Sequence, residues 1–390
     1  MNDFTYYTPT QLVFGRDAEC KTGALAARYG GRALLVYGQG SAVKSGLLDR
    51  VAASLEAAGV AYARYGGARP NPTLAHAEAG VEQALAFGAE LILGVGGGSA
   101  IDTAKAIAHG AANPGVPLWD IWTKQVPLTR SLPVGAVLTM PAAGSEMSDS
   151  AVLTNEAIGK KAGINTDWNR CKFAVVNPAL GATLPKYQLA AGMTDIMMHT
   201  MERYFIPDSR AELTDEIAEG LLRTVIRNGK AVLADPGDYD AMCEIFWASS
   251  LSHNNLTECG RGKDFSVHKL GHALSAKYGT THGATLAAVW GAWAEELYRD
   301  CLPRFCRYAE QVWNVQAEDP ETAAREGIRR TVDYFAALGM PTNLHELGVT
   351  PSDEDCRALA LDATMGDTVK LSRIRPLGAA EVEGIFRRAR

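Results

Sequence analysis

The sequence predicts an α/β domain with a parallel sheet over residues 1–180, followed by an all-helical domain over residues 181–390. A chain of 390 residues is longer than one hydrophobic core usually serves, so two domains are expected. Short apolar runs alternate with helical patterns in the first part, which is typical of a parallel sheet covered on both faces. After Pro185 long helical patterns take over, so the boundary is expected between residues 177 and 185.

The individual elements follow from apolar runs that end at glycine or at other turn residues. Strands are expected at residues 33–37, 60–65 and 91–95, each followed by a helical pattern, at residues 47–58, 73–87 and 100–109. Further strand-like runs cover residues 135–140, 151–154 and 173–176. The helices of the second domain are expected to break at Pro207, Pro236, Pro303, Pro320 and Pro341.

Composition excludes several classes of protein. Hydrophobic residues make up 47% of the chain and charged residues 21%, which is the balance of an ordinary globular protein. The 38 basic and 44 acidic side chains form no basic block, which argues against a nucleic-acid partner. No apolar run approaches the ~20 residues that span a membrane, and the N-terminus lacks the pattern of a secretory signal. Seven cysteines without a CxxC pair indicate free thiols in a reducing cytoplasm.

Two glycine-containing turns follow predicted strands. Residues 96–99 read Gly-Gly-Gly-Ser and lie between a strand and a helix that carries Asp102 and Lys105. Glycines let a ligand approach the backbone closely, and the helix N-terminus attracts phosphate, so this turn is a candidate dinucleotide site. The alternative is a tight turn without a ligand. Residues 38–41 (Gly-Gln-Gly-Ser) form a second, weaker candidate because they do not complete GxGxxG.

The choice between NAD and NADP depends on the residues that follow the first strands. An acidic side chain there binds the ribose 2′-hydroxyl of NAD and repels the 2′-phosphate of NADP. None follows closely after the strand at residues 33–37, and none lies between residues 60 and 69. Ser41, Lys44, Arg64 and Arg69 are nearby instead, which favours NADP.

The histidines predict a metal site. Asp195 and His199 are four residues apart on a helical pattern, as are His268 and His272, and His282 follows soon after. Residues at this spacing share one helix face. One carboxylate and several imidazoles without a thiolate suit either Zn²⁺ or Fe²⁺. The other histidines are expected to be ordinary core residues: His76, His109, His253 and His345. Residues 142–146 (Ala-Ala-Gly-Ser-Glu) lack the spacing of a nucleophile elbow and are interpreted as a loop over the cofactor.

These motifs together resemble the iron-containing (group III) alcohol dehydrogenases, and within them the butanol dehydrogenase-like branch of NADPH-dependent aldehyde reductases. The resemblance covers nearly the whole chain. It rests on residues 96–99 with Asp102, residues 71–73 (Asn-Pro-Thr), residues 139–146, residues 177–178 (Asn-Pro), residues 192–195 (Gly-Met-Thr-Asp) with His199, and residues 264–283.

The resemblance implies particular roles for residues. The metal ligands would be Asp195, His199, His268 and His282, with His272 beside the metal and near the nicotinamide and substrate. The implied cofactor contacts are Gly38, Ser41, Asn71, Gly97, Gly98, Ser99, Asp102, Thr139, Lys161, Thr183 and Leu184. The resemblance also implies a homodimer in which residues 5–13 pair across the interface.

The expected activity is hydride transfer between NAD(P)(H) and a short or medium-chain alcohol or aldehyde. A divalent ion can stabilise the negative charge that develops on the substrate oxygen, and His272 is the candidate for relaying the alcohol proton. Phe265, three residues before His268 and expected on the same helical face, and Trp247 are candidate walls of the substrate pocket.

Two other functions stay open at this stage. One is a dehydroquinate synthase-like lyase that uses NAD transiently. Such a lyase needs several basic side chains beside the metal, and residues 264–282 hold only Lys269 and Lys277. The other is a non-catalytic sensor that binds nucleotide and metal, because every candidate site residue could serve binding alone.

Overall fold

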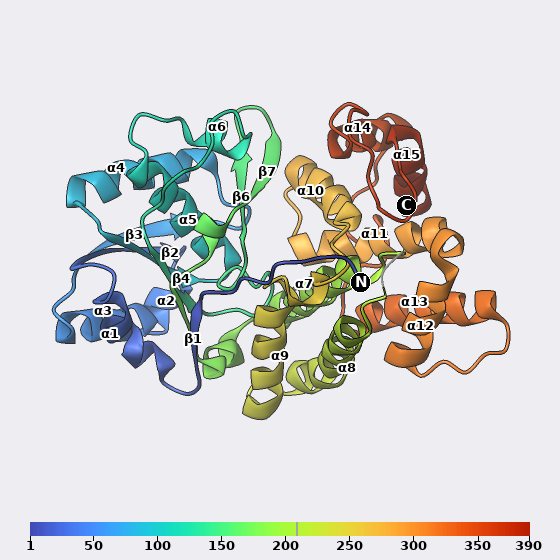
Figure 1. Cartoon of the computed structure of the whole chain (residues 1–390), viewed down its shortest axis with the longest axis horizontal. Helices are drawn as coiled ribbons and strands as arrows, with labels where there is room; N and C mark the ends of the chain where they lie inside the picture. Colours follow the sequence, from blue (N-terminus) through green and yellow to red (C-terminus); the bar gives the residue numbers. More distant parts are fainter. Residues whose placement is uncertain (208–209) are drawn as a thin grey trace. The chain divides into compact units, whose positions relative to one another are not determined.

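The computed structural model describes residues 1–207 and 210–390, which form two compact units. The first unit comprises Tyr7–Thr183, and the second comprises Leu184–Arg390 together with Met1–Tyr6 (Figure 1). The first unit contains the sheet and the second is helical, which confirms the predicted fold class.

A six-stranded sheet forms the centre of the first unit. Its strands, all parallel, lie in the order β1 (Gln11–Phe14), β8 (Phe173–Val176), β5 (Val134–Leu138), β4 (Leu91–Gly96), β2 (Arg32–Gly38) and β3 (Ala61–Ala68). The strands β4, β5 and β8 are buried along their whole length, as expected for a parallel sheet with helices on both faces.

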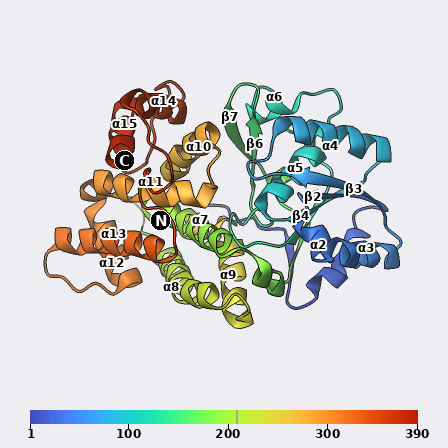
Figure 2. The same ribbon diagram turned by 180° about the vertical axis from the view of Figure 1, so that it is seen from behind.

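Helices connect these strands and cover both faces. They are α1 (Thr22–Ala26), α2 (Ser41–Lys44), α3 (Leu47–Ala57), α4 (Leu74–Phe87), α5 (Gly98–Ala112) and α6 (Leu118–Trp122). Both views show α4 and α5 on one side of the sheet and α2 and α3 on the other (Figures 1 and 2). On the α3 side, Val51 and Leu55 pack with Leu35 and Leu93 of the sheet in one apolar cluster.

One of the predicted strands lies outside the six-stranded sheet. Residues 151–154 belong to β6 (Ser150–Asn155), which pairs antiparallel with β7 (Lys160–Asn165) in a separate two-stranded sheet. The sequence analysis did not predict β7. Lys160, Lys161 and Gly163 give this strand few apolar side chains, so it lacks the hydrophobic pattern by which strands are recognised.

The second unit contains nine helices in its described part. They are α7 (Lys186–Tyr204), α8 (Glu212–Ala234), α9 (Tyr239–Ser252), α10 (Ser266–Tyr278), α11 (His282–Leu297), α12 (Leu302–Trp313), α13 (Pro320–Ala337), α14 (Asp353–Ala363) and α15 (Ala379–Arg388). The five prolines lie between helices or at their first residues, as predicted. No helix in residues 1–207 or 210–390 is long and apolar enough to cross a membrane.

Helix α7 is the most deeply buried element around the predicted metal ligands. Every residue from position 189 to position 204 is buried, although Asp195, His199 and Glu202 are polar. Burial of such groups is costly unless they are hydrogen-bonded, paired or bound to a metal. The polar face of α7 therefore points to a site built inside the helical unit.

Candidate metal centre and cofactor loops

Three helices bring the predicted metal ligands together. Helix α7 carries Asp195 and His199 one turn apart, His268 lies in the first turn of α10, and His282 is the first residue of α11. The Asp195 Oδ1 atom lies 3.4 Å from His268 Nε2, 3.6 Å from His199 Nδ1 and 3.8 Å from His282 Nε2. Residues that are separated by up to 87 positions in the sequence therefore converge on one carboxylate oxygen.

The residues present fit a divalent metal ion. Asp195, His199 and His268 are buried, and Asp195 Oδ1, His199 Nδ1 and His268 Nε2 have no well-aligned hydrogen bond to any described residue. Four ligands at about 2.1 Å from a tetrahedral ion lie roughly 3.4 Å apart, close to the observed separations from Asp195. One donor atom each of Asp195, His268 and His282 lies within 4.8 Å of the other two.

His272 lies beside this cluster. It is one turn after His268 on α10, and its ring centroid is 5.1 Å from that of His282 and 6.2 Å from that of His268. The five catalytic candidates are therefore close together in the structure. Three histidines surround Asp195, and the ring of His272 lies beside two of them, His268 and His282.

The cofactor candidates follow the carboxyl ends of the parallel strands. Strands β2 and β4 are neighbours, with Tyr37 opposite Val95, while β3 lies on the other side of β2. The chain thus reverses its direction of winding between β2 and β4, and dinucleotides bind at such a switch point. The turns at residues 38–41 and 96–99 both emerge there.

The glycines of the second turn are required by close packing. A Cβ atom on Gly96 would meet the Cβ of Ala100 at 2.7 Å, and one on Gly98 would meet the Cβ of Ala143 at 3.3 Å. Helix α5 begins at Gly98 and has no side-chain cap at Gly97. Its first N–H groups and its dipole are therefore suited to binding phosphate, beside the loop that contains Ala143.

Most of the other cofactor candidates belong to the sheet unit. Thr139 follows β5 and its N–H donates to Gly96 O at 3.0 Å. Lys161 on β7 donates through Nζ to Asn71 Oδ1 at 2.9 Å, so the structure brings these two candidates together. Thr183 ends the turn that follows β8, whereas Leu184 belongs to the helical unit.

Both carboxylate oxygens of Asp102 accept hydrogen bonds from other residues of the sheet unit. Its Oδ1 accepts a hydrogen bond from Ser145 Oγ at 2.6 Å, and its Oδ2 accepts one from the N–H of Val152 at 3.0 Å. Lys105, one turn later on α5, donates to Ser145 O, Ser145 Oγ and Ser150 O. The sequence analysis did not predict this network, which ties residues 145–152 to α5.

Comparisons with known proteins agree along the whole chain. The model of the iron-containing alcohol dehydrogenases matches residues 9–178, and that of the C-terminal domain of the Fe-containing alcohol dehydrogenase family matches residues 189–390. This chain belongs to the iron-containing alcohol dehydrogenase family.

Three relatives illustrate the breadth of the match. NADH-dependent butanol dehydrogenase A of Clostridium acetobutylicum is 37% identical over the full length of both chains. NADPH-dependent aldehyde reductase YqhD of Escherichia coli is 36% identical over 90% of this chain and 91% of its own. The crystal structure of NADH-dependent butanol dehydrogenase A from Thermotoga maritima superposes with a TM-score of 0.95 at 33% identity, covering 100% of this chain and 99% of that one.

As a member of the iron-containing alcohol dehydrogenases, the protein is an NAD(P)-dependent oxidoreductase of alcohols and aldehydes with a divalent metal centre. The matched families and relatives are oxidoreductases, so the lyase and sensor alternatives gain no support. The buried donor atoms of Asp195, His199 and His268 are consistent with the metal centre that this family implies.

Burial and charge set the protonation of the dehydrogenase's candidate ligands. Burial, together with the neighbouring imidazoles and Arg203, holds the pKa of His199 well below its usual range. Burial also disfavours the charged form of His268, but the carboxylates of Glu202 and Asp195 outweigh it and raise the pKa of His268 to about 9. A metal ion requires neutral imidazoles, so binding of the ion would compete with the proton on His268.

Sequence analysis missed Glu202, whose carboxylate touches His268. Glu202 Oε2 contacts His268 Nδ1, and Oε1 accepts from the N–H groups of Val267 and His268 at 2.6 and 3.2 Å. A signal was present, because Asp195, His199 and Glu202 are spaced i, i+4 and i+7 and share one helix face. A buried face with three polar residues at this spacing indicates a site.

Two rings near His199 differ from the expectations. The ring of His253, expected as an ordinary core histidine, lies edge-on to that of His199 at 4.0 Å. Phe265 does not share the helical face of His268, because it precedes α10 in a left-handed conformation with φ 63°. Its ring still lies 5.0 Å from that of His268 and 6.0 Å from that of His199. Trp247 on α9 is 42% exposed.

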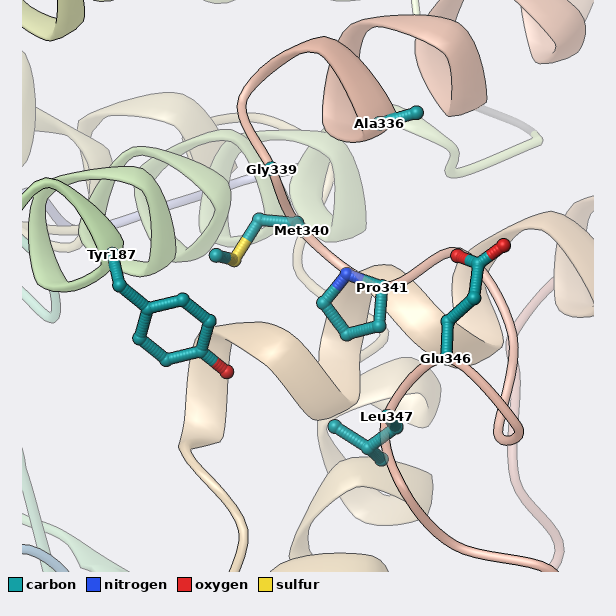
Figure 3. Close-up of a pocket in the computed structure, with 7 residues that line it drawn as sticks. All are labelled: Tyr187, Ala336, Gly339, Met340, Pro341, Glu346 and Leu347. Atoms are coloured by element: carbon teal, nitrogen blue, oxygen red, sulfur yellow. The ribbon is translucent and has the colours of Figure 1, made fainter.

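A shallow hollow of the helical unit lies apart from the predicted site residues. It has a volume of about 340 Å³ and is lined by Tyr187, Ala336, Gly339, Met340, Pro341, Glu346 and Leu347 (Figure 3). Glu346 is the one charged residue among these seven, and its carboxylate already accepts hydrogen bonds from Thr342. None of the predicted site residues lines this hollow.

Proposed function

We propose that the enzyme reduces short and medium-chain aldehydes with NADPH at the cluster around Asp195. The observation that carries this proposal is the convergence of buried, hydrogen-bond-free donor atoms of Asp195, His199 and His268 beside the apolar ring of Phe265. An apolar wall favours an aldehyde with a hydrocarbon tail over a polyol. Faster turnover of glycerol than of butanal would contradict this substrate class.

Asp195, His199, His268 and His282 would hold the ion, which is iron or zinc because the donors are one carboxylate and three imidazoles. When bound, a divalent ion supplies a Lewis acid that stabilises negative charge on a substrate oxygen. Of the chain's own residues, Phe265 limits the room beside the ligands, and His272 relays the alcohol proton from its position 5.1 Å from His282.

The cofactor would lie along the carboxyl ends of the strands. Its contacts are assigned to the candidates that the family resemblance implies: Gly38, Ser41, Asn71, Gly97, Gly98, Ser99, Asp102, Thr139, Lys161, Thr183 and Leu184. Preference for NADPH is supported by Gln39, which stands where an acidic residue would repel a 2′-phosphate, and by Ser41 and Lys44 on the following α2. Arg64 and Arg69 support it less, because they pair with Asp49 and Glu156.

The substitution Gln39→Asp tests the cofactor preference. A carboxylate at this position would accept a hydrogen bond from a ribose 2′-hydroxyl and repel a 2′-phosphate. We expect the ratio of kcat/KM for NADPH to that for NADH to fall at least tenfold, measured by absorbance at 340 nm with butanal. The same change at the exposed Gln125 should leave the ratio unaltered. An unchanged ratio in Gln39→Asp would overturn the role of residue 39.

Reconstitution tests the metal. Metal-free protein is given Fe²⁺, Zn²⁺ or buffer alone, and NADPH oxidation is followed with butanal. Activity that returns with either ion, and remains absent with buffer, supports the proposed centre. Activity in the metal-free protein would contradict it.

We further propose a homodimer in a reducing cytoplasm. Strand β1 is at the edge of the sheet, and edge strands are the usual place for pairing with another chain. Phe4, Tyr6 and Tyr7, which precede β1 in the sequence, are exposed, which favours a partner over them. The seven cysteines are free thiols, as expected in a reducing compartment. Light scattering during size-exclusion chromatography distinguishes a dimer from the 41.7 kDa monomer.

A further inference from the structure

The buried carboxylate of Glu202 makes three contacts, all with the first turn of α10. Oε1 accepts from Val267 N at 2.6 Å and from His268 N at 3.2 Å, and Oε2 contacts His268 Nδ1. The side chain of Glu202 is 1% exposed. Both oxygens are therefore used by a single residue and its neighbour, one of which is a candidate metal ligand.

The N-cap residue of helix α10 supplies no capping side chain. Phe265 occupies that position in a left-handed conformation, and its side chain has no oxygen. By contrast, α9 and α13 are capped by the side chains of their own N-cap residues. Locally, the carboxylate of Asp264 caps α10 by accepting from Ser266 N at 2.9 Å.

The next two N–H groups of α10, those of Val267 and His268, are capped from α7 by Glu202, 65 residues before Val267 in the sequence. The carboxylate thus fixes the start of α10 relative to the helix that carries Asp195 and His199.

The same carboxylate selects the nitrogen with which His268 faces Asp195. When Nδ1–H donates to Glu202, the lone pair of a neutral imidazole is on Nε2. Nε2 is the atom that lies 3.4 Å from Asp195 Oδ1. Carboxylates that orient a ligating histidine in this way typically change metal affinity 10- to 100-fold when they are removed.

We propose that Glu202 is a positioning residue for the metal centre, which holds His268 by both its backbone and its ring and so sets the affinity for the divalent ion. This inference rests on the proposed role of Asp195, His199, His268 and His282 as ligands. Glu202 itself does not contact the candidate donor atom Nε2, and it acts only through His268 and the first turn of α10.

The test compares Glu202→Gln with Glu219→Gln by chelator competition for Zn²⁺ on metal-free protein. Glu219 is an equally buried carboxylate, on α8, which accepts from Tyr204 and Arg307 and does not contact the ligands. We expect Zn²⁺ affinity to fall 10- to 100-fold in Glu202→Gln and less than threefold in Glu219→Gln. Thermal unfolding of both metal-free variants shows whether their losses of stability are comparable.

A double-mutant cycle separates positioning from general stability. In a His268→Ala background, Glu202→Gln should change Zn²⁺ affinity less than threefold, because the residue through which Glu202 acts is gone.

Should Glu202→Gln fail to fold, Glu202→Asp gives the same comparison, since its shorter side chain cannot reach both the ring and the backbone of His268. Wild-type Zn²⁺ affinity in the folded Glu202 variant would overturn only this inference and leave the proposed metal centre in place. A wild-type protein that binds no divalent ion would overturn the proposed metal centre as well.

Discussion

In each unit of the molecule, a buried charged side chain holds part of the candidate site. In the sheet unit, Lys105 is fully buried and donates to Ser145 O, Ser145 Oγ and Ser150 O at 2.7, 3.0 and 2.7 Å. In the helical unit, Glu202 is 1% exposed and accepts three contacts from Val267 and His268. The two side chains are opposite in charge, and Lys105 also forms an ion pair with Asp102 Oδ1 at 3.9 Å.

The difference lies in what each charge holds. Lys105 binds backbone carbonyls and a hydroxyl, so it fixes the shape of a loop whose Ala143 packs against Gly98. Glu202 binds an imidazole, so it fixes the direction of a candidate ligand. On the proposed assignment of the two sites, charge burial in the sheet unit serves cofactor geometry, whereas in the helical unit it serves the metal. Three substitutions test this division, in order of decreasing effect.

Asp195→Ala should have the largest effect. It removes the one carboxylate on which three histidine nitrogens converge at 3.4 to 3.8 Å, so the metal loses its only anionic ligand among the four candidates. We expect bound metal, measured by elemental analysis, to become substoichiometric and kcat/KM for butanal to fall at least about 1,000-fold. NADPH affinity, measured by fluorescence titration, should change less than threefold. A parallel loss of NADPH affinity would contradict the division between the units.

Lys105→Met should weaken the sheet unit and leave the metal in place. Removal of a buried cation leaves its carbonyl acceptors unpaired, which we expect to lower the free energy of unfolding by about 3 kcal/mol. The loosened loop at residues 142–150 should raise the dissociation constant for NADPH about tenfold. Metal content should remain that of the wild type. Urea unfolding, NADPH titration and elemental analysis check the three parts, with the exposed Lys172→Met as the control. Loss of metal in Lys105→Met would contradict the comparison.

The sequence predicted those features that depend on local pattern. The parallel strands, the helical second unit and the glycine turns follow from apolar periodicity and from backbone requirements, both of which are local. Asp195 and His199 could be paired because four residues make one helical turn. The family resemblance then supplied the choice of four ligands among the candidates. Neither the spacing nor the resemblance decides between zinc and iron.

What the sequence did not predict depends on tertiary contacts. Lys and Glu are usually exposed, so nothing local marks Lys105 or Glu202 as buried. Their partners are 40 and 65 positions away in the sequence. His253 approaches His199 only because α9 ends beside α7. The left-handed backbone of Phe265 was also unexpected, because a bulky residue rarely adopts it without support from surrounding structure.

Gly98→Ala should have the smallest effect and gives the sharpest test of the sheet unit. The new Cβ would lie 3.3 Å from the Cβ of Ala143, so the loop must move by a few tenths of an ångström. Alanine is favoured over glycine in a helix by roughly 0.5–1 kcal/mol, which offsets this strain, so stability should hardly change. The start of α5, where we propose that the cofactor phosphate binds, would nevertheless be altered, and we expect NADPH to bind about tenfold more weakly, or roughly 1.4 kcal/mol. Gly384→Ala on α15, where nothing lies within 4 Å of the new Cβ, is the control and should leave NADPH affinity unchanged. If Gly98→Ala binds NADPH as tightly as the wild type, close packing between α5 and the Ala143 loop does not determine cofactor affinity, and Lys105 then stabilises the sheet unit without shaping its site.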